Sequence, residues 1–219
     1  MQDKEKRTKE KGVFMKLYYA PESCAVAVWI ALEWAGAEYE VERVELGSEE
    51  YRKINPSGAV PALDTGDGKI KTQAGPLLSY IAERYPEADL GPDEGIEERF
   101  YFEEISAFLT SDYHPAFWPL FVPEEFTVSE DEEDLENIRQ AAYKSLDAMA
   151  SVLDEILEGK KHLYKDKRTV LDAYAYILSR WLADTPKSWE AYPNLKAFME
   201  NMEKDESVQK ILHAPENQE

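Results

Sequence analysis

A short apolar strand, a proline turn and a lone cysteine follow one another at residues 15–24, and this order constrains the fold most. Residues 15–19 read Met-Lys-Leu-Tyr-Tyr, and Cys24 stands where an apolar-periodic helix predicted over residues 23–35 begins. A thiol at a helix N-terminus faces unpaired N–H groups and the positive end of the helix dipole. Because these groups lower the pKa of a cysteine, the position predicts a nucleophilic thiolate at Cys24.

The alternative to a nucleophilic Cys24 is a buried thiol that packs as a small apolar residue. A second segment helps to decide between the two. Val60 and Pro61 lie inside an apolar run at residues 59–63. A proline there removes one backbone donor and predicts a bend, a sheet edge or a cis peptide bond. The free backbone groups beside it could pair with an extended peptide ligand as another strand would. The two segments together favour a functional Cys24.

Composition narrows the classes of function. The 219 residues suffice for one large or two modest domains, and the formal net charge of −20 argues against a nucleic-acid partner. No run approaches the roughly 18 apolar residues of a membrane helix, so we expect no membrane partner. One cysteine excludes an intrachain disulfide framework and favours a cytoplasmic location. The cysteine and three histidines are too scattered for zinc, so no metal is expected.

The predicted secondary structure changes near Pro86, from strands and helices before it to helices alone after it. Residues 1–14 are interpreted as a disordered leader, and residues 87–95 as a linker. Between them we expect strands over 15–19, 39–44, 60–64 and 69–71 and helices over 23–35, 48–54 and 73–85. Beyond the linker, helical periodicity runs over 96–113, 131–158, 170–184, 193–203 and 206–213. Two predicted capping boxes pair Ser129 with Glu132 and Thr169 with Asp172.

This layout resembles the glutathione transferases, most closely the bacterial beta class, whose members open with Lys-Leu-Tyr-Tyr-x-Pro-x-x-Cys as residues 16–24 do here. Four further segments carry the resemblance, at residues 55–63, 112–121, 169–181 and 193–212. It implies an α/β plus all-α fold, with a thioredoxin-like N-terminal domain at residues 15–86 and a helical-bundle domain at residues 96–219. It also implies that the protein works as a homodimer with glutathione as co-substrate.

The resemblance assigns roles to residues of this chain. Cys24 is the residue nearest the glutathione sulfur and able to form a mixed disulfide with it, and His114 reaches the same region from the helical domain. Val60 pairs its backbone with the cysteinyl part of glutathione, next to Pro61. Tyr19 occupies the position of the tyrosine that activates the thiol in other classes. The implied function is transfer of glutathione to small hydrophobic electrophiles, with thiol–disulfide exchange or peroxide reduction as side activities.

One region departs from the family pattern, and the role of two aromatic residues is left open. The helix at residue 73 normally opens with an acidic residue and a serine that hold the γ-glutamyl end, whereas here Gln73 and Ala74 stand there. We therefore expect weakened glutathione binding, and a non-catalytic scaffold that binds a protein partner is the alternative function. Phe117 and Trp118 are candidates for the electrophile pocket, although aromatic residues at helical spacing are commonly core.

Overall fold

The computed structural model describes residues 14–217, which begin with a four-stranded mixed sheet. Apart from Phe14, the leader predicted for residues 1–14 lies outside this range. Strand β1 is parallel to β2 and antiparallel to β3, and β3 is antiparallel to β4, which gives the order β2-β1-β3-β4. The strands confirm the predicted ones with small shifts at their ends: β1 (Met15–Tyr19), β2 (Tyr39–Arg43), β3 (Ala62–Asp64) and β4 (Ile70–Thr72).

Helices cover both faces of this sheet, because successive strand residues point to opposite sides. The three helices of this part are α1 (Ala25–Trp34), α2 (Glu49–Arg52) and α3 (Ala74–Arg84). Leu17 packs into the large core shared with α1 and α3. Its neighbour Tyr18 points the other way and packs with Tyr51 of α2 in a separate small core.

The rest of the described chain is helical and contains no strand of the sheet. Its helices are α4 (Ile96–Ala107), α5 (Trp118–Phe121), α6 (Glu132–Ile156), α7 (Val170–Arg180), α8 (Pro193–Met202) and α9 (Glu206–Leu212). The single helix predicted over residues 96–113 is α4 followed by a π-helical turn, Phe108–Tyr113. Between residues 14 and 217, no helix has the length and apolarity needed to cross a membrane.

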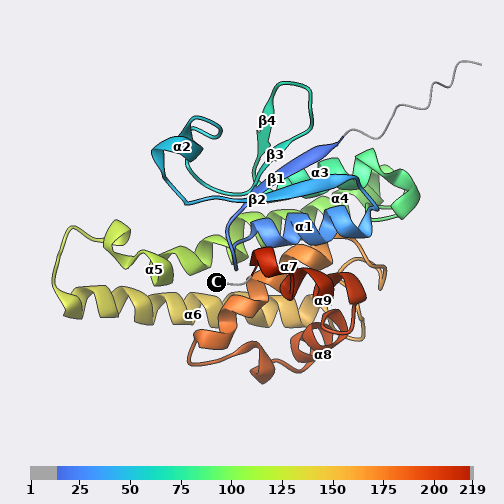
Figure 1. The fold of residues 1–219 in the computed structure, drawn as a ribbon. Helices are drawn as coiled ribbons and strands as arrows, with labels where there is room; N and C mark the ends of the chain where they lie inside the picture. The colour runs from blue at the N-terminus through green and yellow to red at the C-terminus, as the bar shows by residue number, and fades with distance from the viewer. Residues whose placement is uncertain (1–13, 218–219) are drawn as a thin grey trace, which may run out of the picture.

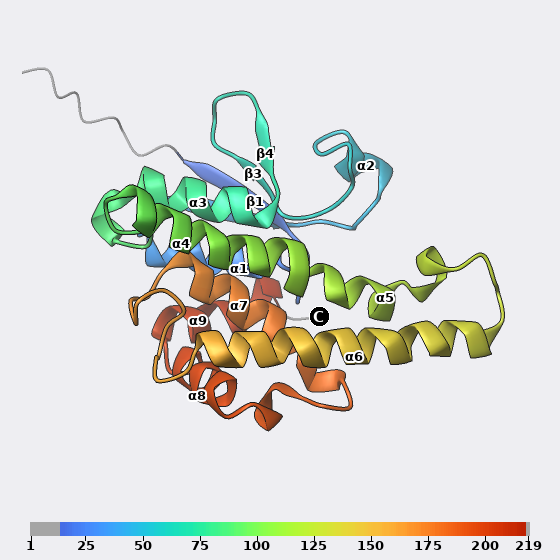
Figure 2. The same cartoon turned by 180° about the vertical axis from the view of Figure 1, so that it is seen from behind.

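Helix α1 joins the two parts of the molecule into one core. Nine of its ten residues are buried. The helix is covered all round because α7 and α9 pack against α1 on the side away from the sheet (Figures 1 and 2). A helix that is apolar all round is typical of a fully buried one. The core is therefore continuous across the predicted linker.

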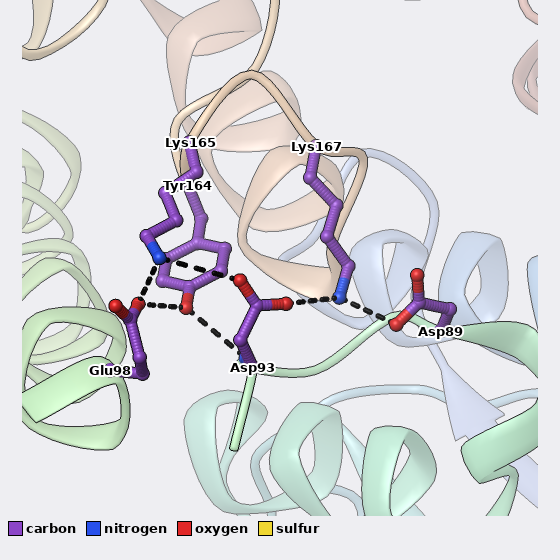
Figure 3. A network of polar contacts seen from close by, with 6 residues as sticks. All are labelled: Asp89, Asp93, Glu98, Tyr164, Lys165 and Lys167. Carbon is purple, nitrogen blue, oxygen red and sulfur yellow. Dashed lines mark hydrogen bonds and ion pairs between the residues drawn. The ribbon is translucent and has the colours of Figure 1, made fainter. Parts of the chain in front are cut away.

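The predicted linker at residues 87–95 is tied to the loop before α7. Leu90 is buried, and its carbonyl accepts the N–H of Val170 at 3.0 Å. Figure 3 shows a network of ion pairs across the same junction. Its members are Lys167 with Asp89 (2.5 Å) and Asp93 (3.2 Å), and Lys165 with Glu98 (2.6 Å) and Asp93 (3.4 Å).

The capping box predicted at the start of α7 is confirmed. Asp172 Oδ2 accepts the N–H of Thr169 at 2.7 Å, and Oδ1 accepts the N–H of Leu163 at 2.9 Å. Asp172 is fully buried, and His162 Nδ1 lies 3.5 Å from its Oδ2. This carboxylate holds the loop before α7 as well as the helix start.

The other predicted capping box, Ser129 with Glu132, is wrong. Helix α6 begins two residues later than that pairing needs, with Asp131 as its N-cap. Asp131 Oδ1 accepts the N–H of Glu133 at 3.1 Å, while Ser129 Oγ accepts the N–H of Asp131. An aspartate competes well for this position because its carboxylate also interacts favourably with the helix dipole.

Removing the Asp172 carboxylate should destabilise the fold strongly. Asp172→Ala leaves two buried N–H groups without acceptors, each at a cost of about 1–3 kcal/mol. We expect the free energy of unfolding to fall by about 2–5 kcal/mol in urea titrations at fixed protein concentration. The exposed Glu155→Ala is the control and should change stability by less than about 0.5 kcal/mol. A similar, small effect of both substitutions would contradict this role.

Candidate active site

A cleft of about 1110 Å³ opens between the sheet part and the helical part. The loop before α1, the loop before β3, the start of α3 and one face of α4 and its π-helical turn contribute to its walls. The structure thus brings together seven of the nine predicted site residues: Cys24, Val60, Pro61, Gln73, Ala74, His114 and Trp118.

The other two predicted residues, Tyr19 and Phe117, do not line the cleft. Tyr19 is fully buried, packs edge-on against Trp29 and donates its hydroxyl to the carbonyl of Glu216. Phe117 is also fully buried, with its ring centroid 5.2 Å from that of Trp181. Tyr19 lies on the face of β1 that α1 covers, and Phe117 forms part of the core beneath the cleft wall.

Cys24 is the N-cap of α1 and is only 8% exposed. Its thiol donates to the carbonyl of Val60, with Sγ 3.6 Å from the oxygen. Burial raises the pKa of Cys24 to about 12, because desolvation disfavours the thiolate more than the backbone N–H at the helix start favours it. The predicted lowering of the Cys24 pKa is therefore wrong, and the thiol is protonated at neutral pH.

The loop opposite Cys24 is held by its own hydrogen bonds. The peptide bond between Val60 and Pro61 is cis, one of the conformations that the sequence predicted. The carbonyl of Ala59 accepts two hydrogen bonds, from Asn55 Nδ2 at 2.7 Å and from the Tyr51 hydroxyl at 2.8 Å. These contacts fix the backbone beside Cys24, where Ala59 and Val60 line the cleft.

Helix α3 starts at the cleft without a side-chain cap. Its N-cap Gln73 is exposed and has φ of 75°, while Ala74 is buried. A Cβ on Gly75 would lie 2.7 Å from Thr110 Cγ2, so only glycine allows α3 to pack this closely against the π-helical turn. Uncapped N–H groups at a helix start are suited to bind an anionic group.

His114 follows the π-helical turn, with its N–H bonded to the carbonyl of Leu109 at 3.0 Å. Its Nδ1 lies 2.7 Å from the hydroxyl of Tyr174. Burial lowers the pKa of His114 to about 4, so the imidazole is neutral at neutral pH. Burial raises the pKa of Tyr174, so its hydroxyl keeps its proton. The sequence missed Tyr174, because a tyrosine in a continuously apolar helix carries no local mark of a site.

Four rings, His114, Trp118, Phe121 and Trp181, form an aromatic wall on the helical side of the cleft. Trp118 is stacked on His114 with ring centroids 6.0 Å apart. Trp181 Nε1 donates to the carbonyl of Glu22 at 2.7 Å and so connects the wall to the loop before α1. The wall suits an apolar, planar ligand.

The charged side chains that line the cleft are all acidic: Glu22, Glu103 and Asp184. No lysine or arginine is among the lining residues of this described part of the chain. Within residues 14–217, no group of three or more His, Cys, Asp or Glu side chains is placed to hold a metal ion. An anionic ligand group would therefore depend on backbone N–H donors.

Known proteins match the chain along most of its length. The family model described as Glutathione S-transferase, N-terminal domain, matches residues 17–89, and the corresponding C-terminal domain model matches residues 109–206. The chain is 32% identical over 208 residues to Glutathione S-transferase GST-4.5 of Xanthomonas campestris pv. campestris, covering 91% of this chain and 98% of the relative.

Two solved structures agree with this assignment. A bacterial beta class glutathione S-transferase from Sphingomonas chungbukensis has a TM-score of 0.82 at 32% identity, covering 93% of this chain and 100% of that one. A sphingomonad glutathione S-transferase complexed with glutathione has a TM-score of 0.80 at 33% identity, covering 91% and 98%. With two domain models, a curated relative and these structures in agreement, the chain belongs to the glutathione S-transferase family.

Proposed function

We propose that the cleft binds glutathione and transfers it to small hydrophobic electrophiles. The observation that carries this proposal is the placement of Cys24, the cis-proline loop, the uncapped start of α3 and His114 around one cleft. Residues 15–86 would form the glutathione-binding domain, and residues 96–219 would shape the electrophile pocket. The single, free cysteine supports a cytoplasmic location.

Glutathione would bind beside Val60 as an extra strand, through backbone hydrogen bonds to its cysteinyl part. A thiol is a weak hydrogen-bond donor, so a ligand amide can replace the contact of the Cys24 thiol with the Val60 carbonyl. The Cys24 S–H then becomes free to donate to the glutathione sulfur. A donor at that position stabilises the glutathione thiolate and increases the reactive fraction.

In the transfer step, the glutathione thiolate attacks the electrophilic carbon. A carbon–sulfur bond forms, the leaving group departs with its bonding electrons, and the thiol proton has passed to solvent beforehand. His114 Nδ1 is occupied by Tyr174, which leaves Nε2 of the neutral imidazole for the ligand. Because Cys24 itself is protonated, the site favours conjugation over thiol–disulfide exchange by this residue. A mixed disulfide at Cys24 stays a prediction from the family resemblance.

We further propose a homodimer that uses the outer face of α4. Ile96 and Phe100 are 82% and 65% exposed and lie one helical turn apart, so they form an apolar stripe. Neighbouring exposed apolar side chains of this size are typical of protein–protein contact surfaces.

Two substitutions of Cys24 test its role in turnover of 1-chloro-2,4-dinitrobenzene. Cys24→Ala removes a donor worth about 1 kcal/mol, so kcat/KM should fall about fivefold to tenfold. Cys24→Ser keeps a donor and should stay within about threefold of the native value. Loss of activity in both variants would instead indicate a nucleophilic cysteine. If the native chain neither turns over this substrate nor is retained on immobilised glutathione, the scaffold alternative replaces the proposal.

Restoring an acidic residue at the start of α3 should strengthen glutathione binding. Gln73→Glu supplies a charged partner for the γ-glutamyl ammonium group, worth about 1.5–3 kcal/mol, so the Kd should fall at least about tenfold. Isothermal titration calorimetry measures this change. Gln140→Glu makes the same charge change on α6 outside the cleft and should leave the Kd unaltered. Equal affinities for the native chain and Gln73→Glu would contradict the expected weakness.

A further inference from the structure

Two acidic residues line the cleft close to the central ring of the aromatic wall, that of Trp181. The Trp181 ring centroid lies 5.2 Å from that of His114 and 5.3 Å from that of Phe121. Because Trp181 Nε1 donates to the Glu22 backbone carbonyl, the backbone of Glu22 is held beside this ring. Asp184 ends the same short 3₁₀ helix that begins with Trp181. Glu22 and Asp184 are both exposed, and both line the cleft.

Among the described residues that line the cleft, no lysine or arginine offsets the charge of Glu22 and Asp184. His114 is neutral at neutral pH, since burial lowers its pKa to about 4. The chain just beyond α5, residues 124–136, contains eight acidic residues and no lysine or arginine, within a protein of net charge −20. Figure 2 shows α5 beside α6, which starts within this acidic segment. A cleft with charges of one sign concentrates ligands of the opposite sign.

We propose that the electrophile side of the cleft selects cationic aromatic compounds over anionic ones, with Glu22 and Asp184 as specificity-determining residues. The inference rests on the proposed function, since it names the charge class of the second substrate. A cation attached to an aromatic ring gains from the indole face of Trp181 and from the adjacent carboxylates. An anion meets the same rings beside Glu22 and Asp184, with no lysine or arginine in the described lining to pair with it.

The most direct test measures binding without glutathione. Three nitroaromatic quenchers of tryptophan fluorescence share a 4-nitrophenyl ring and carry a positive, no or a negative charge: 4-nitrobenzyltrimethylammonium, 4-nitrobenzyl alcohol and 4-nitrobenzoate. We expect the cation to bind the full chain about tenfold more tightly than the alcohol, and the benzoate to bind about tenfold more weakly. The difference should shrink at high salt, because the carboxylates are exposed.

The double variant Glu22→Gln with Asp184→Asn should reduce the preference for the cation to about twofold. Glu155→Gln with Glu158→Gln changes the charge equally at exposed positions outside the cleft, and it should leave the preference unchanged. Equal binding of cation and alcohol to the native chain would overturn the inference. An undiminished preference in the cleft double variant would also overturn it.

Measurements of turnover distinguish failure of this inference from failure of the proposed function. The substrates are three 4-chloro-3,5-dinitrobenzene derivatives bearing a carboxylate, a neutral carboxamide or a carboxamide with a trimethylammonioethyl group. Turnover of the neutral compound without preference for the cation would retain the transferase and reject the selectivity. Absence of any turnover together with cation-selective quenching would reject the transferase activity and support the selectivity of the cleft.

Discussion

The burial of α1 between the sheet and α7 is the constraint on which the rest of the structure depends. Since α1 has no solvated face, its ends are fixed by both parts of the molecule at once. The N-cap residue Cys24 is therefore placed beside the cis-proline loop and below the aromatic wall. The same packing buries Tyr19 against α1, which removes it from the cleft.

The site operates with neutral donors rather than with fixed positive charges. Burial keeps both Cys24 and His114 uncharged at neutral pH for the same reason: it disfavours the charged form of each, which raises the pKa of the thiol and lowers the pKa of the imidazole. No lysine or arginine lines the described cleft, so the uncapped start of α3 is the remaining source of positive potential. On the proposed function, hydrogen bonds stabilise the glutathione thiolate in this cleft. The carboxylates of Glu22 and Asp184 select the second substrate by its charge.

Much of the fold could be predicted because its determinants are local. The strands follow from short apolar runs, and the capping box at Thr169 follows from a spacing of three residues. The family motif also located most of the cleft, including Val60, Pro61 and His114.

The failures at the site share one cause, which is long-range packing. The Cys24 pKa depends on what covers the helix start, and neither α7 nor the loop at Val60 is visible in the local sequence. Tyr174 of α7 contributes its hydroxyl to the cleft, although the sequence did not indicate it. Phe117, a candidate for the electrophile pocket, lies instead in the core. Which aromatic residues face a ligand is decided by how helices pack, and periodicity alone leaves that open.

The pH dependence of Cys24 alkylation tests the central claim most directly. Because the chain has a single cysteine, the mass increase with iodoacetamide reports on this thiol alone. If burial controls the site, alkylation of the ligand-free protein is slow at neutral pH and keeps accelerating as the pH rises toward the Cys24 pKa of about 12. A rate that reaches its plateau below about pH 8, under the ordinary cysteine pKa, would contradict the account.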